Sequence, residues 1–239
     1  MEVNMTAYIL TGGNVWLKNL KTTREEGDIV IAADSGYKNA KALGLTVDAL
    51  IGDMDSINKV PETGNMEIIR LPEEKDVTDT QAAVALALDR GADDICIIGG
   101  IGSRLDHTLS NLSILEDIEG YYSAPLGKRR RFLGLNKQMR LARQINATIT
   151  NGFNRVRFLR DNSAIIPKNP YFRYISIICA EETAKGVCID GVKYPLQNAT
   201  LSRRNQYAVS NEISGNCAFV SVQKGAIYVI ESYDDGFEV

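Results

Sequence analysis

Short apolar runs alternate with helix-like segments over the first half of the chain. Segments 36–43, 79–90 and about 105–119 have helical character, and Thr78-Asp79-Thr80-Gln81 fits a capping box at the start of the second. This alternation predicts an α/β domain with a mostly parallel sheet. The predicted strands are Ala7–Leu10, Ile29–Ala33, Ala49–Ile51, Ile68–Leu71 and Ile95–Ile98.

After about residue 154 the pattern changes to short β-rich segments that partly alternate between apolar and polar positions. Asp-Gly, Asn-Pro and Lys-Gly turn signals separate them. Short strands at this spacing indicate an all-β antiparallel sandwich or barrel. The segments are Arg155–Arg160, Tyr174–Ala180, Val187–Tyr194, Cys217–Val222 and Ala226–Glu231.

A basic stretch lies between these two patterns. The chain carries a net charge of −3, yet residues 120–160 contain ten Lys or Arg residues and no Asp or Glu. Apolar residues within 135–150 recur at helical spacing. We therefore expect three parts: an α/β nucleotide- and metal-binding catalytic domain at 1–122, a basic, partly helical connector at 123–152, and a β-sandwich at 153–239.

Composition excludes several classes of protein. The 44% hydrophobic and 24% charged residues are ordinary for a globular protein, and nothing approaches an apolar run of about eighteen residues, so no membrane span is expected. The N-terminus lacks the basic start and apolar run of a signal peptide. Four scattered cysteines without a CxxC pair argue against a zinc site and favour a reducing, cytoplasmic location.

Polar residues and glycines follow the second to fifth predicted strands. In an open α/β sheet, ligands bind beyond the carboxyl ends of the strands. We therefore expect these side chains to share one edge of the sheet. They are Asp34 and Ser35 after the second strand, Asp53 and Asp55 after the third, Lys75, Asp76, Thr78 and Asp79 after the fourth, and Gly99–Gly102, Arg104, Asp106 and His107 after the fifth.

The donor types at this edge indicate a hard cation and phosphate. Converging carboxylates repel one another unless cations neutralise them, and oxygen ligands without Cys or His favour Mg²⁺. Asp53 and Asp55 lie two apart, so in an extended chain both point the same way. Glycines allow close backbone approach to phosphate, and Lys75 and Arg104 supply positive charge. These features predict phosphoryl or pyrophosphoryl transfer.

Each feature also has a purely structural explanation. Residues 99–102 match a dinucleotide loop only loosely and are also explained as a turn. Asp106 can complete a capping box with Ser103, and Asp79 favours a helix dipole whatever its function. His107, the sole histidine, can serve only to satisfy a backbone carbonyl.

Six motifs in order resemble the thiamin pyrophosphokinase family. They cover most of the chain outside about 120–152. They are Ala33-Asp34-Ser35-Gly36, Gly52-Asp53-Met54-Asp55-Ser56, Lys75-Asp76-Val77-Thr78-Asp79, Gly99-Gly100-Ile101-Gly102-Ser103-Arg104-Leu105-Asp106-His107, Gly191-Val192-Lys193-Tyr194-Pro195-Leu196 and Ser210-Asn211-Glu212.

The resemblance implies an N-terminal α/β nucleotide domain and a C-terminal β-sandwich. It implies a homodimer whose active sites combine the N-terminal domain of one subunit with the C-terminal domain of the other. Thiamin, ATP and Mg²⁺ are the implied ligands. Asp53, Asp55, Asp76 and Asp106 would lie around Mg²⁺ and the triphosphate, while Asp34, Ser35, Thr78, Asp79, Gly100, Gly102 and Arg104 would contact the nucleotide.

For thiamin, the resemblance implies that Tyr194 stacks on the pyrimidine and that Ser210 and Asn211 hydrogen-bond it. Tyr194 stands at a position often occupied by Trp, which leaves room for a different pyrimidine preference. The expected reaction is in-line attack of the thiamin hydroxyl on the β-phosphorus of ATP, with AMP leaving. Lys75 and Arg104 would stabilise developing charge. Asp76 and Asp106 are both candidates to accept the hydroxyl proton.

Two other functions remain open from the residues. An Asp53-x-Asp55 pair also suits a Mg²⁺-dependent phosphohydrolase acting on a nucleotide or sugar phosphate. The basic connector suits a non-catalytic thiamin- or nucleotide-binding module that holds nucleic acid. The acidic edge argues against nucleic acid at the predicted catalytic site.

Overall fold

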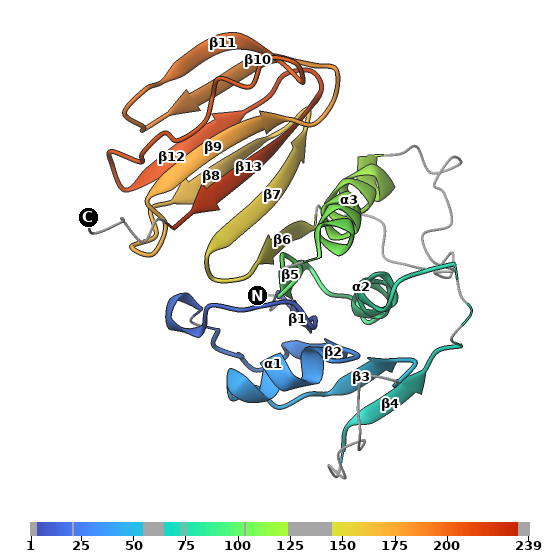
Figure 1. Ribbon diagram of the computed structural model, residues 1–239. Helices are drawn as coiled ribbons and strands as arrows, with labels where there is room; N and C mark the ends of the chain where they lie inside the picture. Colours follow the sequence, from blue (N-terminus) through green and yellow to red (C-terminus); the bar gives the residue numbers. More distant parts are fainter. Residues whose placement is uncertain are drawn as a thin grey trace. The chain divides into compact units, whose positions relative to one another are not determined.

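The computed structural model describes residues 4–20, 22–54, 65–72, 74, 76–102, 104–123 and 145–233. The first part of the chain combines strands and helices in alternation (Figure 1). In order these are β1 (Thr6–Leu10), the 3₁₀ turn η1 (Leu17–Asn19), β2 (Ile29–Ala33), α1 (Gly36–Ala42), β3 (Ala49–Gly52), β4 (Glu67–Arg70), α2 (Asp79–Asp89), β5 (Asp94–Ile98), α3 (Leu105–Ser123) and β6 (Asn146–Thr150).

The strands of this part form a parallel sheet in the order β4-β3-β2-β1-β5-β6. The helices α1, α2 and α3 follow β2, β4 and β5, so each lies in a crossover between parallel strands. All five residues of β2 are buried, as expected for a central strand covered on both faces. The predicted α/β domain with a mostly parallel sheet is confirmed.

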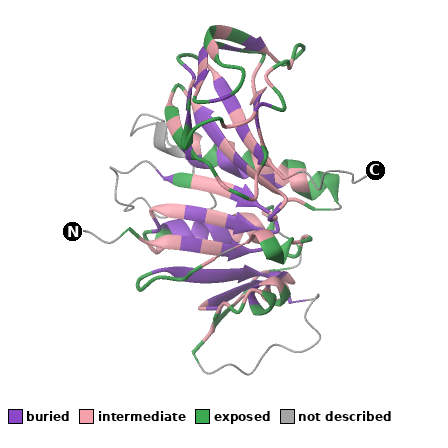
Figure 2. Cartoon of the chain, turned by 90° about the vertical axis from the view of Figure 1, so that its left-hand side faces the viewer, coloured by how far each residue is buried: buried purple, intermediate pink, exposed green. Residues whose placement is uncertain are grey.

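Most residues of the inner strands of the sheet are buried, and they are coloured purple in Figure 2. Ala40 of α1 packs in one cluster with Leu10, Val30 and Leu50. Because successive strand residues point to opposite faces, Ile31 lies on the other face, where it is also fully buried. Helix α2 packs against β1, β2 and β3. Because the inner strands are covered on both faces, a ligand can reach them only at their ends.

The second part of the chain consists of antiparallel strands. Within it, one sheet has the order β7-β13-β9 and the other the order β11-β10-β12-β8. The strands are β7 (Asn154–Arg160), β8 (Ser163–Pro167), β9 (Tyr174–Cys179), β10 (Thr183–Asp190), β11 (Leu196–Ser202), β12 (Cys217–Ser221) and β13 (Ala226–Ser232).

The two antiparallel sheets share one core. Ile177 of β9 and Val229 of β13 belong to the same buried cluster as Val187 of β10 and Val220 of β12. Burial alternates strictly along β9, which is the pattern of a strand with one face on a core. The predicted all-β sandwich is confirmed.

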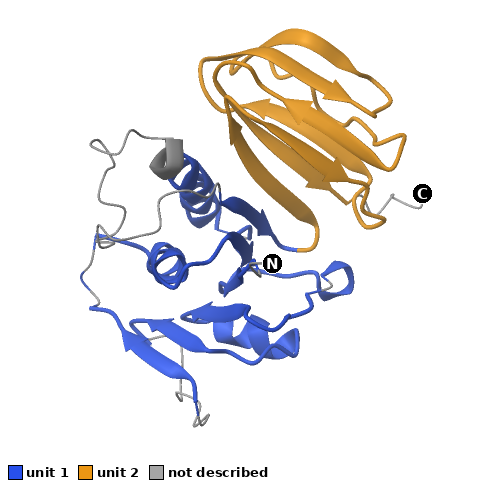
Figure 3. Cartoon of the chain, turned by 180° about the vertical axis from the view of Figure 1, so that it is seen from behind, with its two compact units in different colours: residues 1–151 blue, residues 152–239 orange. Residues whose placement is uncertain are grey.

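The chain divides into two compact units, residues 1–151 and 152–239 (Figure 3). Of the predicted connector, residues 124–144 lie outside the described residues. Residues 146–150 form strand β6, so the helical interpretation of the spacing up to Thr150 is wrong there. Pairing with β5 decides this, because it buries Ile149 completely in the sheet.

Strands β8 and β11 were not predicted. Both are edge strands of their sheet, where fewer side chains are buried and polar residues are tolerated, so their apolar pattern is weak. Strand β10 ends at Asp190, although the predicted segment continued to Tyr194. Gly191 causes this end: its φ is 74°, and a Cβ there would lie 2.3 Å from the carbonyl oxygen of Cys217.

Within the described part of the chain, no helix is both long and apolar enough to cross a membrane.

Candidate active site

Two glycine-containing loops meet where β1 and β5 end. A Cβ added to Gly13, after β1, would lie 2.0 Å from the carbonyl oxygen of Gly99, after β5. A Cβ on Gly102 would lie 3.4 Å from the Cα of Gly13. The loops therefore touch backbone to backbone, which only glycine permits at Gly13. Gly100 and Gly102 were expected here from the sequence, whereas this partner loop was not; its signal was the Gly12-Gly13 pair directly after the first strand.

Amide side chains from the neighbouring helices hold both loops. Nδ2 of Asn39, in α1, donates to the carbonyl oxygens of Thr11 and Gly13 at 2.6 and 2.8 Å. Nδ2 of the buried Asn111, in α3, donates to the carbonyl oxygen of Gly100 at 2.8 Å. These two residues were not expected from the sequence, because nothing in the pattern around an Asn inside a helix indicates which loop its side chain will contact.

Asp34 and Ser35 lie between the ends of β2 and α1. Asp34 adopts a left-handed backbone conformation with φ of 46°, and its amide donates to the carbonyl oxygen of Ile51 at 2.9 Å. Its Oδ1 is buried without a hydrogen-bond partner in the described structure. A buried acceptor left without a donor costs about 1–3 kcal/mol. Strain and an unpaired oxygen in one residue are typical of a ligand-binding position.

The Ser35 hydroxyl points towards the loop after β1. A Cβ on Gly12 would lie 2.0 Å from Ser35 Oγ, so the first glycine of that loop makes room for this hydroxyl. The structure thus brings Asp34, Ser35 and the glycine loops to one edge of the sheet.

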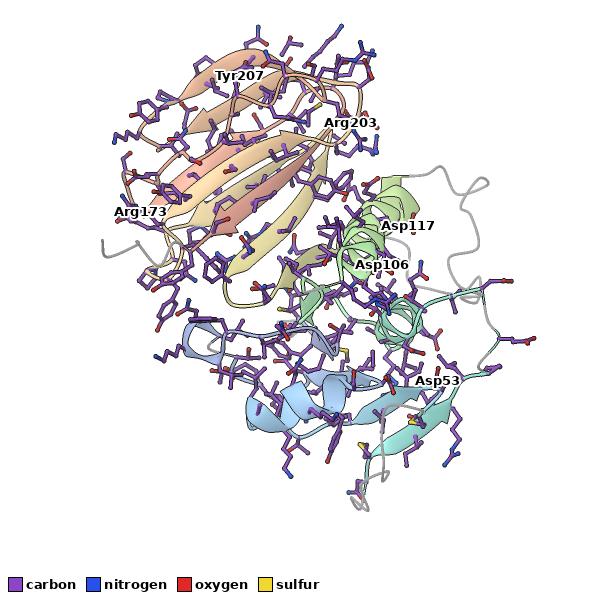
Figure 4. The ribbon with its side chains drawn as sticks, in the orientation of Figure 1. Asp53, Asp106, Asp117, Arg173, Arg203 and Tyr207 are labelled. Carbon is purple, nitrogen blue, oxygen red and sulfur yellow. The ribbon has the colours of Figure 1, made fainter. Side chains whose placement is uncertain are left out.

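Asp53 directly follows β3, next to the end of β2, while Asp106 lies in the first turn of α3 (Figure 4). A Cβ on Gly52 would lie 3.1 Å from Cβ of Asp34, which shows how closely the two strand ends approach. Met54 then adopts φ of 70°, so the chain leaves the strand direction directly after Asp53. Asp55 lies outside the described residues.

The segment after β4 leads into a capped helix. Thr78 Oγ1 accepts from the amide of Gln81 at 3.2 Å, and Gln81 Oε1 accepts from the amide of Thr78 at 2.9 Å, which confirms the predicted capping box. Asp79 is the first residue of α2, and Asp76 lies three residues before it. Lys75 lies outside the described residues. The Thr78 hydroxyl retains its proton for donation to a ligand.

Arg104 and Asp106 form an exposed bidentate pair. Arg104 Nη2 lies 2.6 Å from Asp106 Oδ2, and Nε lies 3.2 Å from Oδ1. The hydrogen bond from Arg104, with a further one from the amide of His107, holds the pKa of Asp106 below the ordinary aspartate value. A carboxylate with a lowered pKa is a weaker base. Asp106 is therefore a poorer proton acceptor than an unpaired aspartate. Ser103, its suggested capping partner, lies outside the described residues.

Acidic residues also occupy the opposite edge of the sheet, so carboxylates are not confined to one end of the strands. Asp28 accepts from the amides of Thr6 and Glu25, each at 2.9 Å, and Asp48 accepts from the amide of Val30 at 2.8 Å. These aspartates complete backbone hydrogen bonds at the strand starts. What distinguishes Asp34 is the absence of such a partner for its buried Oδ1 among the described residues.

The oxygen donors at the carboxyl edge suit Mg²⁺ by type. Among the described residues, however, no group of three or more Asp, Glu, His or Cys side chains is close enough together to hold a metal ion. Asp55 falls outside that set. The buried, unpaired Oδ1 of Asp34 is the observation in favour of a cation or donor at this edge, because it needs one or the other.

The candidate thiamin residues lie in the second unit. Tyr194, in the turn after β10, is 63% exposed, and Nζ of Lys193 lies 5.4 Å from the centroid of its ring. Ser210 is exposed and adopts φ of 57°. Asn211 is buried, and its side chain hydrogen-bonds the main chain of Tyr194. The three residues are therefore neighbours in space, although sixteen positions of sequence separate Tyr194 from Ser210.

Two family models match the chain, one over each unit. Residues 20–122 match the catalytic domain of thiamin pyrophosphokinase, and residues 163–227 match its vitamin B1 binding domain. The chain is 26% identical over 234 residues to the thiamine pyrophosphokinase of Bacillus subtilis, covering 96% of this chain and 99% of that protein. It is 25% identical over 190 residues to thiamin pyrophosphokinase 1 of Caenorhabditis elegans, covering 76% and 69%.

Solved structures agree with these matches. The crystal structure of the Bacillus subtilis protein gives a TM-score of 0.75 at 26% identity, covering 96% of this chain and 99% of that one. A thiamin pyrophosphokinase family protein from Enterococcus faecalis gives 0.72 at 28% identity, covering 98% and 100%. The two domain models, the order of the motifs and these full-length likenesses together show that the chain belongs to the thiamin pyrophosphokinase family.

Proposed function

We propose that this chain transfers the pyrophosphoryl group of ATP to the hydroxyl of thiamin, which gives thiamin diphosphate and AMP. The observation that carries the catalytic half is Asp34, whose strained backbone and buried, unpaired Oδ1 need a ligand at the carboxyl edge of the parallel sheet. Membership of the family supports the choice of thiamin as acceptor. No observation favours the hydrolase or the nucleic-acid-binding module over this function.

Nucleotide binding falls to the two glycine loops and the first turns of the helices beyond them. Gly100 and Gly102 allow the backbone to approach phosphate, and Asp34, Ser35, Thr78 and Asp79 contact the nucleotide. The hydrogen bonds donated by the side-chain amides of Asn39 and Asn111 keep these loops in place before ATP binds. This pre-organisation removes part of the ordering cost of binding.

The carboxylates at the same edge serve the metal and the triphosphate. Asp53, Asp55, Asp76 and Asp106 would hold Mg²⁺, and the ion would supply neutralisation of phosphate charge and polarisation of the transferred group. Arg104, fixed by its bidentate pair with Asp106, and Lys75 stabilise the charge that develops on the phosphate oxygens.

The proton of the thiamin hydroxyl needs an acceptor. Asp76 and Asp106 are the two candidates at this edge, and the hydrogen bond from Arg104, which lowers the pKa of Asp106, makes Asp106 a weaker base than an unpaired aspartate.

We further propose a homodimer in which each active site joins the first unit of one subunit to the second unit of its partner. Mixing inactive Asp53→Asn protein with the weakly active Tyr194→Ala protein, at thiamin concentrations below KM, tests this. Subunit exchange then creates one intact site in each mixed dimer, so activity rises above that of the two variants measured separately. No recovery in a mixture shown to exchange subunits contradicts the shared site, and a monomeric mass by sedimentation contradicts the dimer.

The reaction itself is tested by incubating the protein with ATP, Mg²⁺ and thiamin and separating the products. Thiamin diphosphate and AMP are expected in equal amounts, with loss of both on chelation and recovery on adding Mg²⁺. ADP or free phosphate as the sole product contradicts the proposal, and thiamin-independent AMP favours a hydrolase.

Matched variants connect this reaction to the site. Asp34→Asn is expected to lower kcat/KM by about a hundredfold or more. It should not lower the unfolding temperature, because the oxygen that it alters has no partner to lose. Asp89→Asn, at the exposed far end of α2, provides the control and should leave activity unchanged. Full activity in Asp34→Asn would remove this residue from the site.

A further inference from the structure

Asn211 is held in the second unit by its own main chain. It forms an antiparallel bridge with Ile175 of β9, in which the Ile175 amide donates to the Asn211 carbonyl oxygen at 2.8 Å and the Asn211 amide donates back at 3.0 Å. The residue is 8% exposed. Its side chain therefore starts from a fixed point on the sandwich.

The amide group of Asn211 is directed at the main chain of Tyr194. Nδ2 donates to the Tyr194 carbonyl oxygen at 2.6 Å, and Oδ1 accepts from the Tyr194 amide at 3.0 Å. Oδ1 also accepts from the amide of Glu212 at 3.0 Å. The side chain thus pairs with residue 194 as a neighbouring strand would, and it does so at a point where β10 has already ended.

This pairing uses most of the hydrogen-bonding capacity of Asn211. An amide oxygen has two lone pairs, and both are occupied, while one of the two N–H groups is committed. At most one N–H remains for a ligand. Ser210 differs, because its amide is held by Ser176 Oγ at 3.0 Å while its exposed hydroxyl makes no hydrogen bond within the described structure.

Tyr194 is largely exposed. Its exposed fraction is 63%, and Nζ of Lys193 lies 5.4 Å from the centroid of its ring. Its orientation therefore depends on the turn that carries it. That turn is held by the Asn211 side chain and by the hydrogen bond from the Lys193 amide to the Glu212 carbonyl oxygen at 2.9 Å.

We infer that Asn211 is a positioning residue for thiamin binding, which acts by clamping the main chain of Tyr194 so that its ring presents one face to the ligand. Ser210, in contrast, offers its hydroxyl to the ligand directly. This inference rests on the proposed function. It assigns different roles to the two neighbouring residues: Ser210 binds thiamin, and Asn211 orients the Tyr194 ring. Stacking requires a ring held at a defined angle, so loss of the clamp weakens binding without removing a ligand contact.

A double-mutant cycle distinguishes clamping from direct contact. Asn211→Ala and Tyr194→Ala are each expected to raise the KM for thiamin by about tenfold, with the KM for ATP unchanged. If Asn211 acts through Tyr194, adding Asn211→Ala to Tyr194→Ala changes the KM for thiamin by less than about twofold. Gln197→Ala is the matched control, since this exposed amide of β11 bonds to Asp190 and should affect neither constant.

Additive effects in the cycle, about a hundredfold for the pair, would overturn the inference in favour of direct contact while leaving the proposed function intact. If the wild-type protein forms no AMP that depends on thiamin, the proposed function fails and the role in thiamin binding fails with it.

Amide hydrogen exchange of the ligand-free protein tests the clamp without turnover. Asn211→Ala should speed exchange at the Tyr194 amide, while β10 keeps its protection. Unchanged exchange at Tyr194 contradicts the clamp. Should Asn211→Ala fail to fold, Asn211→Asp serves instead. The aspartate carboxylate can still accept hydrogen bonds from the amides of Tyr194 and Glu212, but it cannot donate one to the Tyr194 carbonyl oxygen.

Discussion

The contact between the two glycine loops gives a prediction whose size follows from the structure. In Gly13→Ala the new Cβ would lie 2.0 Å from the Gly99 carbonyl oxygen, 3.1 Å from its carbon and 3.4 Å from the Ile101 carbonyl oxygen. Real Cβ atoms essentially never approach within 3.0 Å of such atoms. Both neighbours are backbone, so no flexible side chain can give way, and the loops must separate by about 1 Å.

Two consequences follow from that separation. Overpacking of this kind costs about 1–3 kcal/mol of folding free energy. If these loops position ATP as proposed, a displacement of about 1 Å costs about a hundredfold in kcat/KM for ATP. The assay is thiamin-dependent AMP formation at varied ATP, together with urea unfolding of the same preparation.

Gly44→Ala separates the two effects. Gly44 has φ of 71° and nothing within 4 Å of the added Cβ, so the substitution strains the backbone by about 1–2 kcal/mol without moving a loop of the site. Gly44→Ala should therefore lower the free energy of unfolding about as much as Gly13→Ala does, but leave the activity unchanged. Near-normal activity in Gly13→Ala, or an equal activity loss in both variants, would refute the role assigned to the loop contact.

Two further predictions concern charged pairs. Glu231 is 1% exposed and is ion-paired with Arg155 and Arg157, so Glu231→Gln should cost about 3–5 kcal/mol in urea unfolding. Glu182→Gln, which breaks an exposed pair, should cost less than about 1 kcal/mol, and equal costs would contradict this reasoning. Arg104→Gln should raise the pKa of Asp106 towards the ordinary aspartate value, because the lowering depends first on the Arg104 hydrogen bond. Since the folded pKa of Asp106 is depressed, the stability that this pair contributes is present above about pH 4 and is lost as the pH falls further. A ¹³C NMR titration of the Asp106 carboxyl checks the shift, and an unchanged pKa contradicts the assigned cause.

Local sequence pattern was sufficient for the elements of the parallel sheet. The apolar runs predict β1 to β5 to within a residue or two. For the inner strands the reason is that strands covered on both faces need continuous apolar residues, whereas β4 is a mostly exposed edge strand. The capping box at Thr78 and the glycine after α2 marked both ends of that helix, since these signals act within one turn. The motifs at the strand ends, in their order, indicated the family and both domains.

Tertiary structure decided what depends on partners distant in sequence. Strand β6 forms because it completes the sheet beside β5, and the edge strands β8 and β11 are held by neighbours rather than by their own apolar pattern. No local pattern could reveal that Gly13 touches Gly99, or that Asp28 is satisfied by backbone amides while Asp34 keeps a buried, unpaired oxygen.

The Ser210-Asn211 pair shows the same division within one motif. By itself the sequence determined which residue types stand at the two positions proposed to serve thiamin binding. Only the folded chain shows that the Asn211 amide already bonds both main-chain groups of Tyr194, because that hydrogen bonding joins positions seventeen residues apart.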